Sequence, residues 1–332
     1  MGNQTGSAVL GQKRYSKFSE LMAKPEMLTI IALVVLIVIM CFARPDTFPT
    51  PTNFFNIIRG FSLYAILAVG MGLIIITGGI DLSVGSTIAF SAALACYVNL
   101  QSGGIPAIFV LLIVLGMGTA VGSANGLLIA KVGVPPFIAT LGMLSLGKGF
   151  ALLITNGSPI KYEPTWISTL GGGYIGEMPV SVVVTAAVVI VGFIFANNTL
   201  KGRNIYAVGN SIRAAMLSGI RVDNIIILVY AITGFLSGLC GLLLIGLMNS
   251  ADPSFGSGYE LQVIAAAVIG GISMTGGEGN ILGTVAGAAL MGVLKNMFVQ
   301  LAVSGYWQTI ILGCVIIGAV AIDSIRKKQA TR

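Results

Sequence analysis

Histidine is absent from this chain of 332 residues, and charged residues make up only 9% of it. Without histidine, most zinc sites and the Ser-His or Cys-His pairs of nucleophilic enzymes are excluded. The four cysteines fall inside or at the ends of apolar blocks and form no CxxC pair, so we interpret them as small packed hydrophobic residues. The scarcity of charge excludes a soluble domain, in which about a quarter of residues are charged.

Apolar residues and glycine make up most of what is present. Hydrophobic residues account for 56% of the chain, the mean hydropathy is +0.97, and there are 45 glycines. A soluble fold of this length could not bury so much apolar surface, whereas a bilayer accommodates it. Glycine also lets membrane helices approach one another closely. The composition therefore predicts a polytopic membrane protein.

Apolar blocks long enough to cross a membrane, which takes about 20 residues, follow one another along the chain. They cover roughly residues 27–42, 57–77, 84–100, 105–130, 136–154, 179–195, 225–248, 259–274, 281–303 and 306–322. We predict an all-α polytopic fold of about ten transmembrane helices, forming a single transmembrane domain over residues 27–323. The blocks at 84–100 and 259–274 are the shortest. Proline-rich residues 43–56 and the polar residues 155–178 are predicted loops.

Basic residues mark one side of the membrane. They gather before the first block, in a central loop and in the C-terminal tail: Lys13, Arg14, Lys17, Lys24, Lys201, Arg203, Arg213, Arg221, Arg326, Lys327, Lys328 and Arg332. By the positive-inside rule, the tails 1–26 and 324–332 and the loop 197–224 face the cytoplasm, and an even number of spans agrees with this. There is no basic face with interleaved aromatic residues, so no nucleic acid is expected as a partner.

The loop 197–224 is the main polar stretch between apolar blocks. Its core, Ala207 to Ile220, has the composition of one short helix, with Gly209, Asn210 and Ser211 at its start and Ser218-Gly219 at its end. Such a basic helix of small residues is a surface that another protein can bind. We expect Gly209→Trp to block that surface while leaving membrane insertion intact.

Glycines also recur at helical spacing. Gly118, Gly122 and Gly126 follow one another at every fourth position, and 234/238 and 283/287 form single pairs. Such spacing is typical of a dimer seam or of packing within one subunit. Residues 77–94 and 275–290 both begin Thr-Gly-Gly and share a later glycine, which indicates either an internal duplication or chance.

Two nucleotide-binding patterns fail on inspection. GMLSLGKG at 142–149 has glycine where a phosphate-binding loop needs a hydroxyl, and it lies within an apolar helix. GGGYIG at 171–176 follows no strand and opens no helix. We expect this chain to bind no cofactor and no metal, and any ATP to be hydrolysed by another chain.

Asp81 is the charged residue most clearly embedded in apolar sequence. Charges within membranes are unfavourable and usually functional. Flanking glycines permit a broken helix, in which the carboxylate either caps the next helix start or faces a pore. Glu278 is expected in a cytoplasmic turn, and Lys295 to reach the interface or pair with an acid.

Three motifs in order, GGIDLSVGS (78–86), GRNIYAVGNSIRAAMLSGI (202–220) and AAAVIGGISMTGGEGNILGT (265–284), resemble the permease subunits of bacterial ABC sugar importers of the ribose type. The resemblance covers essentially the whole chain, including FIATLGM at 137–143. It implies a type II importer fold, two permease copies or a permease with a sister subunit, a cytoplasmic ATPase that holds ATP and Mg²⁺, and a periplasmic sugar-binding protein. It also implies a bacterial inner membrane.

The same resemblance implies which residues of the central loop meet the ATPase. They are Tyr206, Gly209, Asn210, Arg213, Ala214, Ala215, Ser218, Gly219 and Ile220.

We therefore predict a transport path for a neutral monosaccharide or polyol, with weak binding by hydroxyl and amide groups. Candidate residues along the path are Asp81, Ser83, Ser86, Asn125, Thr140 and Asn249. An ion-coupled transporter would need several buried acids or histidines, and an intramembrane enzyme would need a nucleophile with a base. Neither set is present in the sequence.

Overall fold

The structure, a computed structural model, describes residues 25–330. Of the two predicted tails, residues 1–24 and 331–332 lie outside this range, and residues 324–330 continue the last helix. Over residues 25–330 the chain is mostly helical. Its helices are α2 (Pro25–Ala43), α3 (Pro51–Ile76), α4 (Val84–Gln101), α5 (Ala107–Leu127) with a π-helical turn (Leu128–Val132), α6 (Pro136–Thr155), α7 (Trp166–Gly172), α8 (Val180–Asn198), α9 (Leu200–Asn210), α10 (Ile212–Leu217), α11 (Val222–Met248), α12 (Tyr259–Ile269), α13 (Ile281–Gln300) and α14 (Gly305–Ala330).

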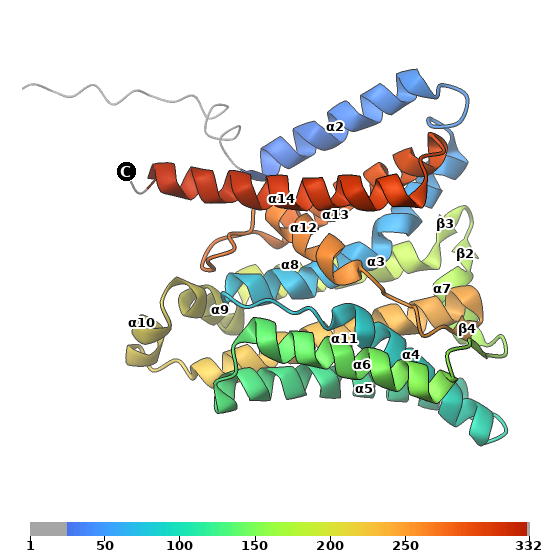
Figure 1. The fold of residues 1–332 in the computed structure, drawn as a ribbon, viewed down its shortest axis with the longest axis horizontal. Helices are drawn as coiled ribbons and strands as arrows, with labels where there is room; N and C mark the ends of the chain where they lie inside the picture. Colours follow the sequence, from blue (N-terminus) through green and yellow to red (C-terminus); the bar gives the residue numbers. More distant parts are fainter. Residues whose placement is uncertain (1–24, 331–332) are drawn as a thin grey trace, which may run out of the picture.

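The long helices lie roughly along one direction (Figure 1). Helices α2 and α14 form one flank and α5 and α6 the other, while α3, α11, α12 and α13 lie between them. The short helices α9 and α10 project at one end, where α14 also ends. At the opposite end, two small antiparallel pairs join β1 (Ile160–Lys161) to β4 (Ser250–Ala251) and β2 (Tyr174–Ile175) to β3 (Met178–Pro179).

Eight helices in the described residues are long and apolar enough to cross a membrane. Two shorter apolar helices, α12 and the first part of α14, bring the number of apolar helices to ten. This confirms the predicted all-α polytopic membrane fold.

Three predicted boundaries were wrong. Residues 43–56 were expected as a loop, but α3 begins at Pro51, because the Thr50 side chain accepts a hydrogen bond from Asn53 N at 3.2 Å and proline suits the first helical position. The block 259–274 is helical only to Ile269, where two glycines begin an irregular connection. The loop 155–178 contains α7, which a capping box at Thr165 starts.

The core lies around the second half of α3. Every residue from Tyr64 to Ile76 is buried. Buried residues of α11, α12 and α13, such as Leu243, Val263 and Met291, belong to the same core cluster. By contrast, α2 is largely exposed along its apolar length, as expected for a helix that faces lipid.

Close packing between α5 and α11 explains the repeated glycines. A Cβ added at Gly118 or Gly122 would overlap the backbone of α11 at Gly234, and one at Gly126 would meet Ile227. The pair at 283 and 287 packs against α12 in the same way. These glycines therefore allow helix contact within one subunit, and the alternative of a dimer seam at these positions was wrong.

Gly122→Ala should destabilise the fold by about 1–3 kcal/mol, because the added methyl group overlaps the Tyr230 carbonyl of α11. The matched control is Gly116→Ala on the same helix, where nothing lies within 4 Å of an added Cβ. Thermal unfolding of the purified protein in detergent measures both. Equal melting temperatures for the two variants would contradict the packing seen here.

Candidate functional site

The central polar loop forms two helices rather than the single helix predicted for 207–220. Gly209 and Asn210 end α9, and the extended backbone of Ser211 (φ −163°) separates it from α10. The Ser211 side chain then accepts a hydrogen bond from Ala214 N at 3.2 Å. An N-cap in the middle of the loop is the reason that one helix cannot continue.

The outer surface of α10 is exposed and partly apolar. Leu217 is 84% exposed, and Ile212 and Met216 of the same helix are exposed too. Of the residues predicted to meet an ATPase, most are exposed here: Asn210, Arg213, Ala214, Ser218 and Gly219. We call this set, with Ile212, Met216 and Leu217, the α10 surface. An exposed apolar group rimmed by polar residues is typical of a protein-binding surface.

The remaining predicted residues point inward. Ala215 is buried and Ile220 packs against the core. A Cβ on Gly209 would overlap the Ile76 carbonyl at the end of α3 and the backbone of Gly277. The Cβ direction of Gly209 therefore faces an internal contact rather than the outside of the loop, and its part in ATPase coupling stays a prediction.

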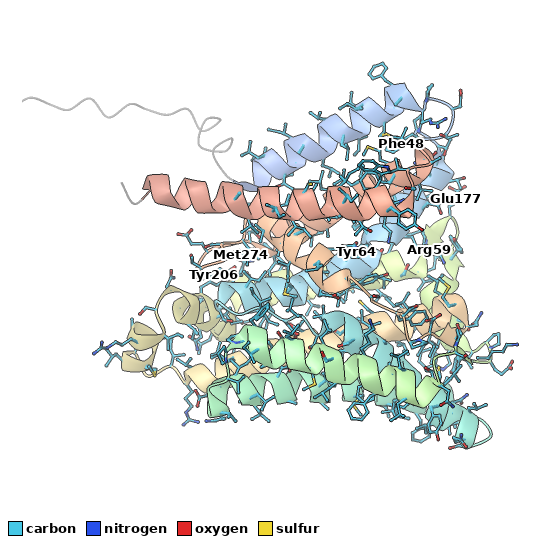
Figure 2. The ribbon with its side chains drawn as sticks, in the orientation of Figure 1. Phe48, Arg59, Tyr64, Glu177, Tyr206 and Met274 are labelled. Atoms are coloured by element: carbon cyan, nitrogen blue, oxygen red, sulfur yellow. The ribbon has the colours of Figure 1, made fainter. Side chains whose placement is uncertain are left out.

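Three segments meet at this contact, which we call the α9 junction: the end of α9, residues 76–79 and residues 276–279. Gly277 N donates to the Ile76 carbonyl at 2.9 Å. The Tyr206 hydroxyl donates to the Gly279 carbonyl at 3.0 Å (Figure 2), and burial raises the pKa of Tyr206, which keeps it protonated as a donor. The two Thr-Gly-Gly stretches, far apart in sequence, thus lie side by side here.

Beyond the junction, an extended segment leads to the start of α4. Asp81 Oδ1 accepts hydrogen bonds from Ser83 N at 2.7 Å and from Ser83 Oγ at 2.6 Å. Asn125 Nδ2 of α5 donates to Ser83 Oγ at 2.8 Å. Asp81 is only 2% exposed and Asn125 is fully buried. Two roles were considered for Asp81. This geometry supports the structural role, since the carboxylate is bound to Ser83 at the start of α4 and does not face an open path.

Neighbouring helices hold the same segment from two further sides. The Ile80 carbonyl accepts hydrogen bonds from the Tyr230 hydroxyl of α11 at 3.1 Å and from Thr140 Oγ1 of α6 at 3.4 Å. Thr140 also donates to the Pro136 carbonyl at 2.9 Å. Backbone outside regular structure needs such partners when water cannot reach it.

The starts of α4 and α12 lie against each other. A Cβ on Gly85 would overlap the Gly256 carbonyl and would approach Glu260 Oε2 to 2.7 Å. Glycine at position 85 thus leaves room for both the loop before α12 and the Glu260 carboxylate. The loop 249–258 reaches inward to this contact through Gly256, which is buried.

A cavity of 320 Å³ opens beside these two helix starts. Its polar lining comes from α4, α6, the loop 252–257 and α12: Ser86, Lys148, Asp252, Ser254, Ser257 and Glu260. Of the predicted path residues, Ser86 alone lines it. Lys148 and Glu260 were not among the candidates, although a lysine inside an apolar block at 136–154 is a signal that could have indicated them. In the described residues, no three Cys, Asp or Glu side chains could hold a metal ion.

Asn249 lies away from this cavity. It ends α11 with a left-handed backbone (φ 47°), and its side chain accepts a hydrogen bond from Ser168 Oγ at 2.6 Å. The other two charged candidates are also separate. Glu278 is exposed in the turn beside α9, and Lys295 donates to the Tyr64 hydroxyl at 2.9 Å rather than to an acid.

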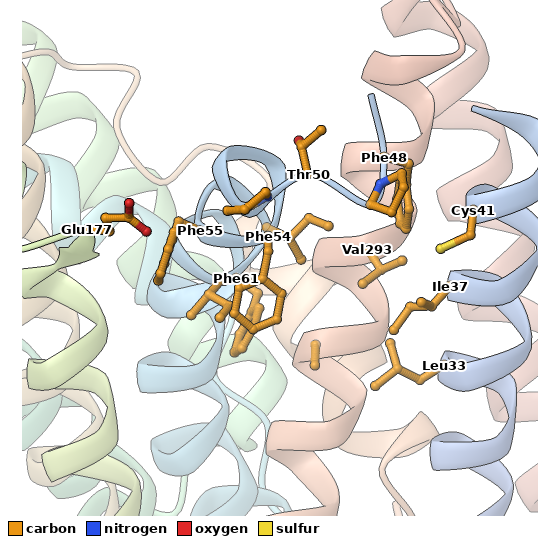
Figure 3. Close-up of a pocket in the computed structure, with 15 residues that line it drawn as sticks. Leu33, Ile37, Cys41, Phe48, Thr50, Phe54, Phe55, Phe61, Glu177 and Val293 are labelled. Carbon is orange, nitrogen blue, oxygen red and sulfur yellow. The ribbon is translucent and has the colours of Figure 1, made fainter. Parts of the chain in front are cut away.

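A second cavity, of 630 Å³, lies between α2, α3 and α13 (Figure 3). Phe54 and Phe61 of α3 face Leu33 and Ile37 of α2 across it, and Phe48 lies at its edge near Cys41. Glu177 at one edge is its only charged lining residue. A wall of this kind suits an apolar group and offers few partners for a hydroxyl-rich molecule.

Comparison with known proteins places the chain among permeases. It is 41% identical over 308 residues to the ribose import permease protein of Escherichia coli (strain K12), covering 92% of this chain and 94% of that one. It is 38% identical over 302 residues to the ribose import permease protein of Bacillus subtilis (strain 168), with 90% and 92% covered. The galactose/methyl galactoside import permease protein of Escherichia coli (strain K12) is 35% identical over 314 residues, with 89% and 93% covered.

No solved structure matches the chain. A family model described as "Branched-chain amino acid transport system / permease component" matches residues 53–320. The chain therefore belongs to this family of transport-system permease components.

Proposed function

We propose that this chain is the transmembrane permease subunit of an ABC importer for a monosaccharide, such as a pentose, a hexose or a related polyol. The observation that carries the proposal is the 41% identity to a ribose import permease over 92% of the chain. The polar cavity beside α4 and α12 supports it, because serine, lysine and carboxylate side chains can bind hydroxyl groups.

The family description names branched-chain amino acids instead. We favour a sugar because the ribose and galactose permeases match nearly the full chain at 35–41% identity. An amino acid remains the competing substrate class, and a transport assay separates the two.

A partner ATPase would supply the energy. This chain carries no phosphate-binding loop in a suitable context, so ATP and Mg²⁺ belong to the partner. The α10 surface is the docking site that we assign to it, since it combines exposed apolar side chains with Arg213 at one end of the helix bundle.

The α9 junction suggests how ATPase closure would reach the path. The inner side of α9 touches both residues 76–79, which lead to the start of α4, and residues 276–279, which connect α12 to α13. Movement of α9 would therefore act on both helices whose starts line the cavity, and packed elements transmit such displacements as rigid units.

Other partners follow from the same assignment. A periplasmic sugar-binding protein would deliver the substrate at the end that carries the β-strand pairs, and a second copy or a sister permease would complete the pore within the lipid bilayer. The termini and the α9–α10 segment would face the cytoplasm of a bacterium, in its inner membrane.

The direct test is co-purification of the tagged chain followed by reconstitution. We expect an ATPase to be recovered, and its ATP hydrolysis to rise when one sugar-loaded binding protein is added. Recovery of the chain alone, with uptake driven only by an ion gradient, would reject the proposal.

Leu217→Asp should prevent ATPase docking, because a charge replaces an apolar side chain that is 84% exposed on the α10 surface. Loss of a well-packed interface residue weakens binding by about 2 kcal/mol or more, roughly 30-fold. Pull-down of the ATPase measures it. The control is Leu301→Asp. Leu301 is an exposed leucine at the C-terminal end of α13, away from the α10 surface, and its replacement should leave docking unchanged.

Gly209→Ala should leave ATPase docking intact but lower sugar uptake by about tenfold, since the added methyl group displaces α9 from the α9 junction. Pull-down and uptake are measured on the same membranes. Gly60→Ala, with nothing within 4 Å of the added Cβ, is the matched control. Normal uptake by Gly209→Ala would show that the junction does not couple the two parts.

A further inference from the structure

We propose that Lys148 and Glu260 form the pair of side chains that binds the hydroxyl groups of the sugar during passage. This inference rests on the proposed function, and it identifies the binding groups within the 320 Å³ cavity. Neither residue belongs to the central loop or to the buried hydrogen-bond network around Asp81.

The two charges come from different helices and share one cavity. Lys148 lies in the middle of α6, and Glu260 lies in the first turn of α12. They are close enough for the lysine charge to act on the carboxylate, yet among the side chains that the structure describes the only ion pair within 4.0 Å joins Lys131 to Asp223. The space between Lys148 and Glu260 is therefore not closed by a direct salt bridge.

The position of Glu260 depends on a missing side chain. Its Oε2 atom would lie 2.7 Å from a Cβ at position 85, so the glycine there admits the carboxylate to the start of α4. The half-buried carboxylate accepts hydrogen bonds from the backbone N–H groups of Gly258 and Glu260 at the start of α12, and the cavity beside it leaves room for further hydrogen-bond partners.

The chemistry of the pair matches a neutral polyol. A carboxylate has two acceptor oxygens that can take hydrogen bonds from adjacent hydroxyls, and an ammonium group has three donors for hydroxyl or ring oxygens. The opposite charges cancel, so the pair carries no net charge toward a neutral molecule. Ser86, Ser254 and Ser257 add hydroxyl groups to the same lining. Asp252 contributes less, because its Oδ1 already accepts two hydrogen bonds from Ser254.

The two groups are also placed to separate when the transporter moves. Glu260 belongs to α12, whose far end continues into the connection that contacts α9, whereas Lys148 belongs to α6. Displacement of α9 would shift Glu260 relative to Lys148, which would lower the affinity of the site for the sugar. A site that forms in one state and opens in another suits a path in which substrate must leave.

The experiment uses the transporter assembled with its ATPase and binding protein, in vesicles. Glu260→Gln and Lys148→Met remove each charge with little change in size. Matched controls are Asp223→Asn and Lys131→Met, which remove the charges of a solvent-exposed ion pair outside the cavity. We expect sugar uptake at saturating binding protein to fall by about 10- to 100-fold in the cavity variants, the effect of losing a charge-assisted hydrogen bond.

Two further readouts separate substrate binding from a structural role. Recovery of the assembled complex and its basal ATP hydrolysis should be unchanged in both cavity variants. In Glu260→Gln, removal of the sugar hydroxyl that Glu260 binds should reduce uptake less than it does in the wild type. The hydrogen bond between that hydroxyl and the carboxylate is already absent in the variant.

The outcomes are distinct. Wild-type uptake in both cavity variants would overturn the inference and leave the proposed function standing. Absence of sugar uptake by the unmodified transporter, or uptake of a branched-chain amino acid in its place, would overturn both.

Discussion

Backbone that leaves regular structure inside a membrane protein must find its partners within the protein, and residues 77–83 meet that constraint. Their carbonyl and amide groups are held by Asp81 and Ser83 within the segment and by Tyr230 and Thr140 from two other helices. Because this break is stabilised, α4 can start in the interior of the bundle rather than at its end. The polar cavity exists beside that start.

Close approach of helices is the second condition for this arrangement. Within lipid the hydrophobic effect does not drive one helix to pack against another. Helix association therefore depends on contact between backbones and on small residues. The α5–α11 contact provides it through paired glycines, and the α12–α13 contact does so at Gly283 and Gly287. With those helices fixed, the short α12 is held with its first turn at the cavity.

A common attachment at α9 then relates the outside of the molecule to its interior. The α10 surface is exposed, while the opposite side of the same loop touches the ends of two segments that lead toward the cavity. Glycine at position 209 serves this inner contact, which explains why a small residue occurs there although Asn210 beside it is exposed. Docking and transmission thus use opposite sides of one short stretch.

The sequence by itself determined the class of the protein, because apolar content, block length and the distribution of basic residues depend on partition between water and lipid, which is local. It also indicated the polar loop, the Ser211 cap and the importance of Asp81. Only the tertiary structure decided that Asp81 closes a buried network, that Gly209 faces inward, and that Lys148 and Glu260 share a cavity. Those facts depend on contacts between α4, α6 and α12, and the separation of these helices along the chain leaves no local pattern from which their meeting could be read.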